Sequence, residues 1–375
     1  MRRRVWWVTA AIVLVLAPFA GRDIRASWAD QANGLGGDYR VSVFDADHDI
    51  VRSINPYPSP DSDTLLSADA VYPPFVFVVA VPISFLPFVA SASIWLALLI
   101  AASIATPWLV GVRDPRCFGL WLVSAPVVAD VMWGNATILV GLGAALAWHF
   151  RDDARLAGAA LGAGAAVKIL LAPLVVWLVF TRRFRASVLS VVICATLVLV
   201  CWAAIGFAGI VDYPAVIRRL AQAQTGGGLF LSGLLAAHGW SANSAVAVGA
   251  VPALVLFSLA WYRRRHDAAA FALVLLAILW ITPVNHVFNL VLMMLAVAVI
   301  YPRLSVPWAL MPLLWIVAFS GPVYRTHHDA LTAISMTFAV IATVAVMKGS
   351  RSSPTTETGI GSVPHVSPGF VGEVR

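Results

Sequence analysis

Runs of apolar residues recur from one end of this chain to the other, separated by short polar segments. A membrane-spanning helix needs about 20 predominantly apolar residues, with a lower limit of about 17. Inside a bilayer every backbone group must be hydrogen-bonded within the protein, and a helix achieves this within one segment. The strict two-residue alternation of a membrane barrel is absent. The pattern therefore predicts an all-α polytopic membrane protein, a bundle of about 10–12 transmembrane helices. The apolar segments cover residues 5–21, 73–88, 89–111, 117–133, 134–150, 156–181, 186–206, 243–262, 268–284, 286–301, 305–321 and 330–347.

Arginine clusters at the ends of apolar segments indicate the topology. Such clusters favour the cytoplasmic side of a membrane, and they occur here at residues 2–4, 182–185 and 263–265. The start of the chain resembles a signal peptide, but the many spans that follow favour a retained signal-anchor with a cytoplasmic N-terminus. Arg113 and Arg116 also favour the cytoplasm, whereas simple alternation of spans places them outside.

The polar stretches between spans form the candidate extracytoplasmic surface. The first, 22–72, holds nine of the 18 acidic residues of the chain, and the second large one covers 207–242. The surroundings of His286 and of His328 fall on the same side. Together with the spans they make up one membrane domain, 1–348. Residues 349–375 are rich in Ser, Pro, Thr and Gly, which predicts a disordered cytoplasmic tail.

Composition and charge exclude two classes of protein. The chain is 61% hydrophobic and only 11% charged, whereas soluble chains carry about 25% charged residues. The net charge of +7 comes from arginines clustered at span ends, so it reports topology rather than nucleic-acid binding. The three cysteines lie in or beside apolar segments without metal-ligand spacing, and they are interpreted as core residues. The sequence suggests no metal and no cofactor.

An ordered series of short motifs carries a family resemblance. Asp38-Tyr39 is followed by Asn55-Pro56-Tyr57, then by Tyr72-Pro73-Pro74-Phe75. Further along stand Trp133-Gly134-Asn135, a Leu156-Ala157-Gly158 block that runs through Lys168 to Pro173, and Thr282-Pro283-Val284-Asn285-His286. This order resembles glycosyltransferase family 87 of the GT-C superfamily over roughly residues 5–347. Two departures are the five-residue separation of Lys168 from Pro173, and His286 in place of the family's Trp near the Ser-Pro motif.

The resemblance implies an enzyme that moves a sugar from a polyprenyl-phosphate donor to a glycolipid or polysaccharide acceptor at the outer face of the plasma membrane. Family members transfer mannose or arabinofuranose, and mannose is favoured here. The implied mechanism inverts the anomeric centre, with one carboxylate as general base. Asp38 matches the family's Asp and is the predicted base. Tyr57 and Tyr72 belong to the matched motifs and are candidate donor or acceptor contacts.

Other polar residues are open to two interpretations each. Asp45 and Asp47 are alternatives to Asp38 or contacts to acceptor hydroxyls, and otherwise solvated loop residues. His286, with Asn285 beside it, follows a Thr-Pro break at membrane depth, where an ionisable group is a functional candidate; otherwise it is an interfacial histidine bonded to a backbone carbonyl. Lys168 lies in an apolar run, where a lysine costs about 2.5–3.5 kcal/mol on insertion scales unless it is paired or faces water.

Lys168 therefore either extends to the interface or reaches a phosphate or a carboxylate such as Asp38 or Asp130. Asn135 either caps its helix or contacts ligand. Arg218 and Arg219 either clamp the donor phosphate or form a solvated pair. Asp61, Asp63 and Asp69 are interpreted as surface turns.

Two other classes of function remain open at this point. A transporter or flippase of a lipid-linked intermediate predicts ionisable groups along a path through the bilayer and repeat symmetry. A non-catalytic partner in a cell-envelope complex needs no catalytic constellation. An enzyme predicts instead that Asp38, Lys168, His286 and the 207–242 stretch line one cavity.

Overall fold

The computed structural model describes residues 35–58, 72–318 and 321–352, and every regular element in those ranges is a helix. The expected first span at 5–21, the carboxylates Asp61, Asp63 and Asp69, and most of the expected tail lie outside the described residues. The α-helices are α2 (Gly37–Tyr39), α3 (Asp45–Val51), α4 (Pro74–Ser84), α5 (Phe88–Leu109), α6 (Pro115–Leu122), α7 (Ala125–Trp133), α8 (Thr137–His149), α9 (Ala154–Val167), α10 (Val175–Phe180), α11 (Phe184–Ala204), α12 (Tyr213–Gln224), α13 (Leu231–Ala237), α14 (Ala242–Gly249), α15 (Val251–Tyr262), α16 (Asp267–Ile281), α17 (Val291–Ile300), α18 (Leu310–Leu313) and α19 (Gly321–Ser352). A π-helical turn, η1 (Arg40–Phe44), and the 3₁₀ turns η3 (Ile169–Leu174), η4 (Thr225–Gly227), η5 (Val287–Leu290), η6 (Val306–Ala309) and η7 (Leu314–Val317) connect them.

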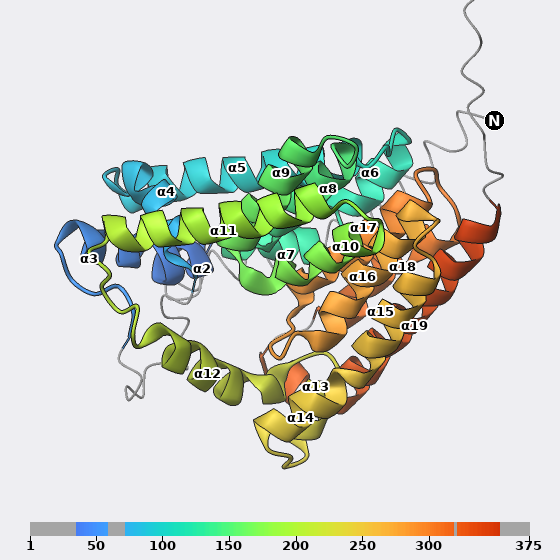
Figure 1. Cartoon of the computed structure of the whole chain (residues 1–375). Helices are drawn as coiled ribbons and strands as arrows, with labels where there is room; N and C mark the ends of the chain where they lie inside the picture. The colour runs from blue at the N-terminus through green and yellow to red at the C-terminus, as the bar shows by residue number, and fades with distance from the viewer. Residues whose placement is uncertain (1–34, 59–71, 319–320, 353–375) are drawn as a thin grey trace, which may run out of the picture.

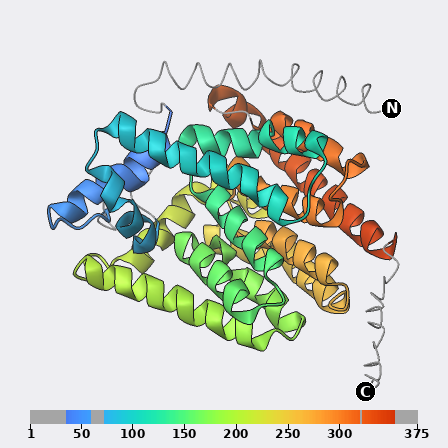
Figure 2. The same ribbon diagram turned by 90° about the horizontal axis from the view of Figure 1, so that it is seen from above.

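The helices form two packed groups (Figure 1). In the first group α5, α8, α9 and α11 lie in a row, with α5 and α11 at its edges when the molecule is seen from above (Figure 2). The second group contains α15, α16, α17 and α19, and it joins the first through contacts of α8 with α17 and of η3 with α16. The two groups thus share one apolar core.

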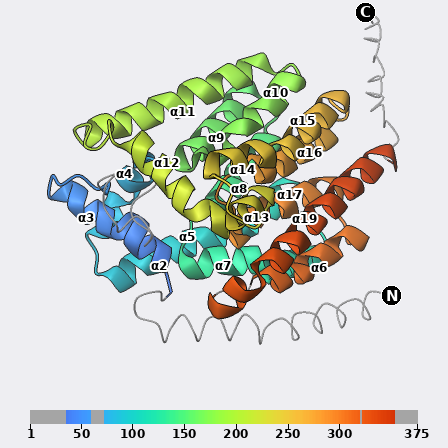
Figure 3. The ribbon, with the colours of Figure 1, turned by 90° about the horizontal axis from the view of Figure 1, so that it is seen from below.

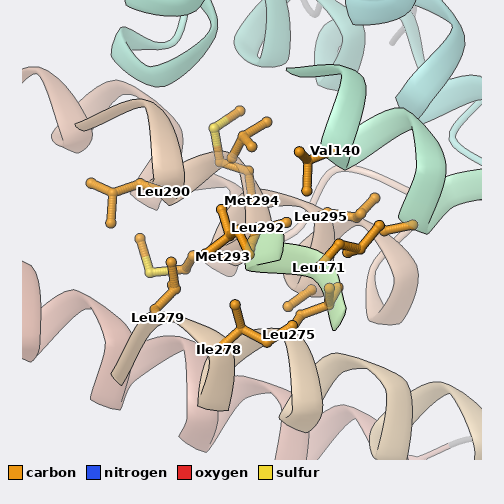
Figure 4. Close-up of a cluster of buried hydrophobic side chains, with 14 of the residues drawn as sticks. Val140, Leu171, Leu275, Ile278, Leu279, Leu290, Leu292, Met293, Met294 and Leu295 are labelled. Atoms are coloured by element: carbon orange, nitrogen blue, oxygen red, sulfur yellow. The ribbon is translucent and has the colours of Figure 1, made fainter. Parts of the chain in front are cut away.

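Small residues allow the first group to pack closely. A Cβ atom on Gly158 would stand 2.8 Å from the Cβ of Leu189, and one on Gly162 would stand 2.7 Å from the carbonyl oxygen of Ser190. These glycines therefore let the backbones of α9 and α11 touch, as small residues four apart do in many membrane bundles. The core of the second group is made of large side chains instead, and Figure 4 shows those of α16 and α17 packed with Val140 of α8 and Leu171 of η3.

The expected class, an all-α polytopic membrane protein, is confirmed. By length and composition, four helical segments of the described chain can cross a membrane, and a fifth span is gained if the α6–α7 pair, bent by 52°, counts as one. Seven further apolar helices have 10–17 residues, which is short for a full span. The expected count of 10–12 therefore includes helices that are broken within the bundle, such as the predicted 156–181 segment, which divides at Lys168 into α9 and η3–α10.

The simple alternation that places Arg113 and Arg116 outside counts the 73–88 segment as a span, but its helix α4 is short for one. Its 11 residues extend only about 16 Å at 1.5 Å per residue. The following helix α5 begins near α2, where Tyr39 stacks on Trp95, and ends where His149 Nδ1 lies 3.1 Å from the Leu109 carbonyl oxygen. Arg113 and Arg116 therefore lie at the same end of the bundle as the turn that follows His149.

An ion-pair cluster around Asp267 holds that end of the bundle together. We call this end the arginine end. The Asp267 carboxylate accepts hydrogen bonds from both Nη atoms of Arg183, at 2.9 and 2.8 Å, and from Trp177 Nε1 at 2.7 Å. Arg151 Nε lies 3.4 Å from the same carboxylate. Charged groups from the α8–α9 turn, the α10–α11 turn and the start of α16 are thereby joined.

Helices also occur in the polar stretches outside the expected spans, among them α2 and α3 in the 22–72 stretch. The 207–242 stretch is built from α12, η4 and α13, and α12 crosses from the end of α11 toward α13 and α14 (Figure 3). At the C-terminal end, α19 continues to Ser352, so the first residues of the expected 349–375 tail are helical.

Candidate active site

A cavity of about 920 Å³ lies at the end of the bundle opposite the arginine end. Its walls come from α2, the α7–α8 turn, the α9–η3 junction, the second half of α11, α12 and the break between α16 and η5. Five of the sequence-predicted site residues line it: Asp38, Tyr72, Asn135, Lys168 and His286. The 207–242 stretch contributes the inner face of α12, so the arrangement that an enzyme predicts is present.

Asp38 is held in place by close contact between α2 and the end of α7. The backbone N–H of Gly36 donates to the Met132 carbonyl at 2.7 Å. Gly134 has a φ of +71°, and a Cβ there would stand 2.8 Å from the Cβ of Tyr39, so only glycine fits. Trp95 stacks on Tyr39 with ring centroids 5.1 Å apart and donates from Nε1 to the Gly134 carbonyl at 2.8 Å. The carboxylate next to Tyr39 is therefore fixed by packing.

A chain of hydrogen bonds connects Lys168 to Asp38. Lys168 Nζ donates to Thr137 Oγ1 at 2.9 Å, and Thr137 Oγ1 donates to Asn135 Oδ1 at 2.7 Å. Asn135 Nδ2 then donates to Asp38 Oδ2 at 2.8 Å. Asn135 Oδ1 also accepts at 3.0 Å from the backbone N–H of Thr137, the first residue of α8, a group that has no partner within its own helix. Asn135 thus bonds the first turn of α8 and also lines the cavity, and its contact with a ligand stays a prediction.

Lys168 lies in an extended break between α9 and η3, where its φ is −152° and its ψ is 122°. Its ammonium faces the rings of Tyr72, at 5.9 Å, and Phe288, at 5.4 Å. It also interacts electrostatically with Asp38 and with the fully buried Asp130 of α7. The cost of a lysine within an apolar run is thus offset by a hydroxyl acceptor, two aromatic faces and two carboxylates.

The ionisation of Asp38 is set by opposing effects. Burial raises its pKa above the ordinary value, whereas the hydrogen bond from Asn135 and the charge of Lys168 lower it. A carboxylate with a raised pKa is a stronger base than a solvated one, and the two lowering contacts favour the ionised form that a base requires.

His286 stands in the break that follows Thr282-Pro283, and its ring lies 5.4 Å from that of Phe288 at the cavity wall. The neighbouring Asn285 has a structural position. Its Nδ2 donates to the Leu279 carbonyl of α16, and its own carbonyl accepts from the backbone N–H of Leu229 at 2.9 Å. Asn285 is fully buried and does not line the cavity, so its predicted ligand contact lacks support from the geometry.

The other predicted residues also lie outside the cavity lining. Asp45 is exposed, whereas Asp47 is fully buried in α3, where burial raises its pKa to about 8. Tyr57 is buried behind the wall, packs on Trp202 and Tyr213, and donates to the Tyr72 carbonyl at 3.1 Å. Arg218 is exposed and Arg219 is half-buried on α12, and neither lines the cavity. A phosphate clamp formed by these arginines stays a prediction without geometric support.

Sequence reasoning missed several residues of the site. Thr137 is fully buried between Lys168 and Asn135, and Asn289 Oδ1 lies 3.5 Å from its hydroxyl. Trp202 and Tyr213 form part of the apolar wall. Such residues are ordinary at the ends of apolar segments in membrane proteins, so their types gave no signal. The only available signal was the position of Thr137, two residues after Asn135.

The cavity has a polar corner and an apolar wall. The corner holds one carboxylate, one ammonium, one imidazole and the amides of Asn135 and Asn289. The wall is formed by Val198 and other residues of α11 and by the inner face of α12. Such a site suits a ligand with a polar, charged head and a long apolar tail.

Fold and cavity together define a polytopic membrane protein whose buried polar site opens onto an apolar groove. The sequence model of glycosyltransferase family 87 matches residues 70–284, more than half of the chain. The chain belongs to glycosyltransferase family 87, and the protein is a membrane glycosyltransferase. The matched range includes Tyr72, Asn135 and Lys168 but neither Asp38 nor His286. No match was found among curated proteins or among solved structures.

Proposed function

We propose that this glycosyltransferase has the GT-C fold and moves mannose from a polyprenyl-phosphate donor to a hydroxyl group of a glycolipid or polysaccharide acceptor. The observation that carries the proposal is the cavity, in which Asp38, Lys168 and His286 share a polar corner beside an apolar wall. A polyprenyl-phosphate sugar has the same division, because a neutral sugar and an anionic phosphate are joined to a long hydrocarbon chain.

Asp38 acts as the general base in this proposal. The acceptor oxygen attacks the anomeric carbon of the donor sugar and loses its proton to Asp38, while the bond from that carbon to the phosphate oxygen breaks. The polyprenyl phosphate leaves with the electron pair of that bond, and one displacement inverts the anomeric centre. Asn135 occupies Oδ2 of Asp38, which leaves Oδ1 for the acceptor hydroxyl.

Lys168 and His286 are assigned to the departing phosphate. Both line the cavity. Lys168 supplies a cation and His286 an imidazole N–H donor, and such groups placed where negative charge develops stabilise the transition state more strongly than the ground state. The apolar wall receives the first isoprene units of the carrier. Its members Ile217, Leu220 and Ala221 share the inner face of α12, at helical spacing.

The active site is placed on the extracytoplasmic face of the plasma membrane, with both termini in the cytoplasm. The arginine clusters 182–185 and 263–265 precede α11 and α16, whereas the cavity residues of these segments, such as Trp202 and Thr282, lie at or just beyond their opposite ends. Because positive clusters favour the cytoplasmic side, the cavity end faces outward.

The test uses the purified full chain in liposomes with radiolabelled polyprenyl-phosphate sugars and a membrane fraction that supplies acceptors. Transfer of mannose from the lipid-linked donor, and not from a nucleotide sugar, is the expected result. Asp38→Asn is expected to abolish transfer, and Asp212→Asn, which alters an exposed carboxylate outside the cavity lining, serves as the matched control. Lipid-linked sugar that crosses the bilayer without transfer would indicate a flippase and contradict the proposal, and preference for another sugar would overturn the assignment of mannose.

A further inference from the structure

We propose that Thr137 is a positioning residue for the transfer reaction, because its hydroxyl orients the Asn135 amide that holds Asp38. The inference rests on the proposed role of Asp38 as the base. Thr137 is fully buried and does not line the cavity, so it acts through other residues and makes no contact with the substrate.

The direction of each hydrogen bond follows from the donors present. An ammonium group only donates, so the Thr137 oxygen accepts from Lys168 at 2.9 Å. The single hydroxyl hydrogen of Thr137 is then free to donate elsewhere. Asn135 Oδ1 at 2.7 Å is a closer acceptor than Asn289 Oδ1 at 3.5 Å, so the hydrogen goes to Asn135.

Two donors from Thr137, its hydroxyl and its backbone N–H, thus converge on Oδ1 of Asn135. An amide whose oxygen accepts on one side must present its NH₂ group on the other side. Here Nδ2 lies 2.8 Å from Asp38 Oδ2. The surrounding network therefore fixes the orientation of this amide, and Thr137 supplies both bonds that fix it.

The threonine also determines how Lys168 influences the base. The positive charge reaches Asp38 through space and through two neutral groups rather than through a direct hydrogen bond. A carboxylate paired directly with an ammonium is a weaker base, because the cation stabilises its ionised form. The intervening hydroxyl and amide keep Asp38 ionised while one of its oxygens stays available.

Other titratable groups act on the same corner and must be considered in any pH experiment. Asp130 and Tyr72 interact electrostatically with Asp38, and His286 interacts with Lys168. A substitution of the Thr137 side chain leaves the backbone hydrogen bond from Thr137 to Asp130 in place, but it removes the hydroxyl that accepts from Lys168. A shift of the pH profile in such a variant therefore reports the loss of the hydroxyl that connects Lys168 to the Asn135–Asp38 hydrogen bond.

The test is Thr137→Val, which keeps the shape and removes the hydroxyl. Its kcat is expected to fall by about tenfold to a hundredfold, the effect of weakening one hydrogen bond to a charged group. The donor KM should stay within about threefold, because Thr137 contacts no substrate. With the Asn135 bond weakened, the pKa of Asp38 rises, so the acidic limb of the kcat profile should move upward by about one pH unit.

Two variants provide the comparison. Thr137→Ser restores a hydroxyl and is expected to recover the wild-type profile. Thr106→Val removes another fully buried threonine hydroxyl, which donates to the Ala102 carbonyl of its own helix, and it should change neither kcat nor the profile. If Thr137→Val does not yield a monodisperse protein, Thr137→Ala serves the same purpose with a smaller side chain.

A hydroxyl-deficient variant with wild-type kcat and an unshifted acidic limb would overturn the proposal, and so would a serine variant as defective as the valine variant. Asp38→Asn separates this outcome from failure of the proposed function. If Asp38→Asn is inactive while Thr137→Val is normal, only the positioning role is lost. If Asp38→Asn retains full turnover, the base assignment itself is wrong.

Discussion

The two ends of this helical bundle hold their charges in opposite ways. At the arginine end, Asp267 accepts two hydrogen bonds from Arg183 and one from Trp177. At the cavity end, a hydroxyl and an amide stand between Lys168 and Asp38. The same helices connect both ends, because α9 runs from the α8–α9 turn at the arginine end to Lys168, and α16 runs from Asp267 to the break that carries His286.

This difference suggests that the Asp267 carboxylate serves stability and that the Asp38 carboxylate serves catalysis. A carboxylate that accepts several direct hydrogen bonds is locked in place, which suits a contact that holds helices together. A carboxylate that has one neutral donor and lies half-buried beside a cavity keeps an oxygen available for a proton. The contrast predicts that substitutions at the cavity end will lower kcat and that substitutions at the arginine end will lower the melting temperature.

The largest expected effect is that of Asp38→Asn on turnover. A general base contributes about 10²–10⁴-fold to a rate, and the amide cannot take up the acceptor proton. We expect a loss of kcat in this range with an unchanged melting temperature, measured with labelled donor and by thermal unfolding in detergent. A variant that lost stability and activity in proportion would show that Asp38 has a structural role like that of Asp267. The proposed difference between the two ends would then be wrong.

Asp267→Asn should show the reverse behaviour. It removes the charge that Arg183 and Arg151 approach and leaves those cations with a weaker acceptor. Loss of a charge-assisted hydrogen-bond network of this kind costs about 1–3 kcal/mol. The melting temperature should therefore fall, while kcat per folded molecule stays at the wild-type level. Reduced kcat in fully folded Asp267→Asn protein would mean that the two ends are coupled.

Asp47 offers a smaller test at the cavity end. Burial raises its pKa to about 8 from an ordinary value of 3.8, so the folded protein binds a proton between these values that the unfolded chain has released. Stability attributable to this group is therefore present below about pH 4 and is lost as the pH rises toward 8. Asp47→Asn should raise the melting temperature at pH 8 by at least about 2 °C and leave it unchanged at pH 4. Equal effects at both values would contradict the burial of an ionisable group there.

Arg218→Gln is expected to have the smallest effect. This side chain is exposed on α12 and lies outside the cavity lining, so donor KM and kcat should both change by less than about threefold, as for surface substitutions in general. The measurement is a donor titration at fixed acceptor concentration. An increase in donor KM above tenfold would restore the phosphate clamp that the sequence suggested.

Much of the fold followed from hydrophobic patterning, but the breaks within helices did not. The 156–181 segment is continuous in apolar character, yet it divides at Lys168. Similarly, α4 begins an apolar segment but turns back after 11 residues. Patterning reports the environment of a residue and not the direction of the chain, so it could not show that Arg113 and Arg116 lie at the same end of the bundle as the turn after His149.

The site was predicted in part. Asp38 stood out because it matches a motif of the family that the sequence resembles, whereas Lys168 and His286 stood out because ionisable groups are costly near apolar segments. Thr137 gave no such signal, because a threonine in a membrane helix usually bonds the carbonyl four residues before it, as Thr106 does. Asp45 and Asp47 were indistinguishable in sequence, yet one is exposed and the other fully buried.

The sequence by itself determined the membrane class, the helical architecture and the resemblance to the family. The length of apolar runs, the hydrogen bonding of the backbone within a single helix and the order of motifs can all be read from one segment at a time. The tertiary structure alone decided that Asn135, 97 residues from Asp38, donates to it, and that Thr137 joins Asn135 to Lys168. Hydrogen bonds depend on tenths of an ångström and on direction, and only the packing of α2 against α7 and of α8 against α9 sets these quantities.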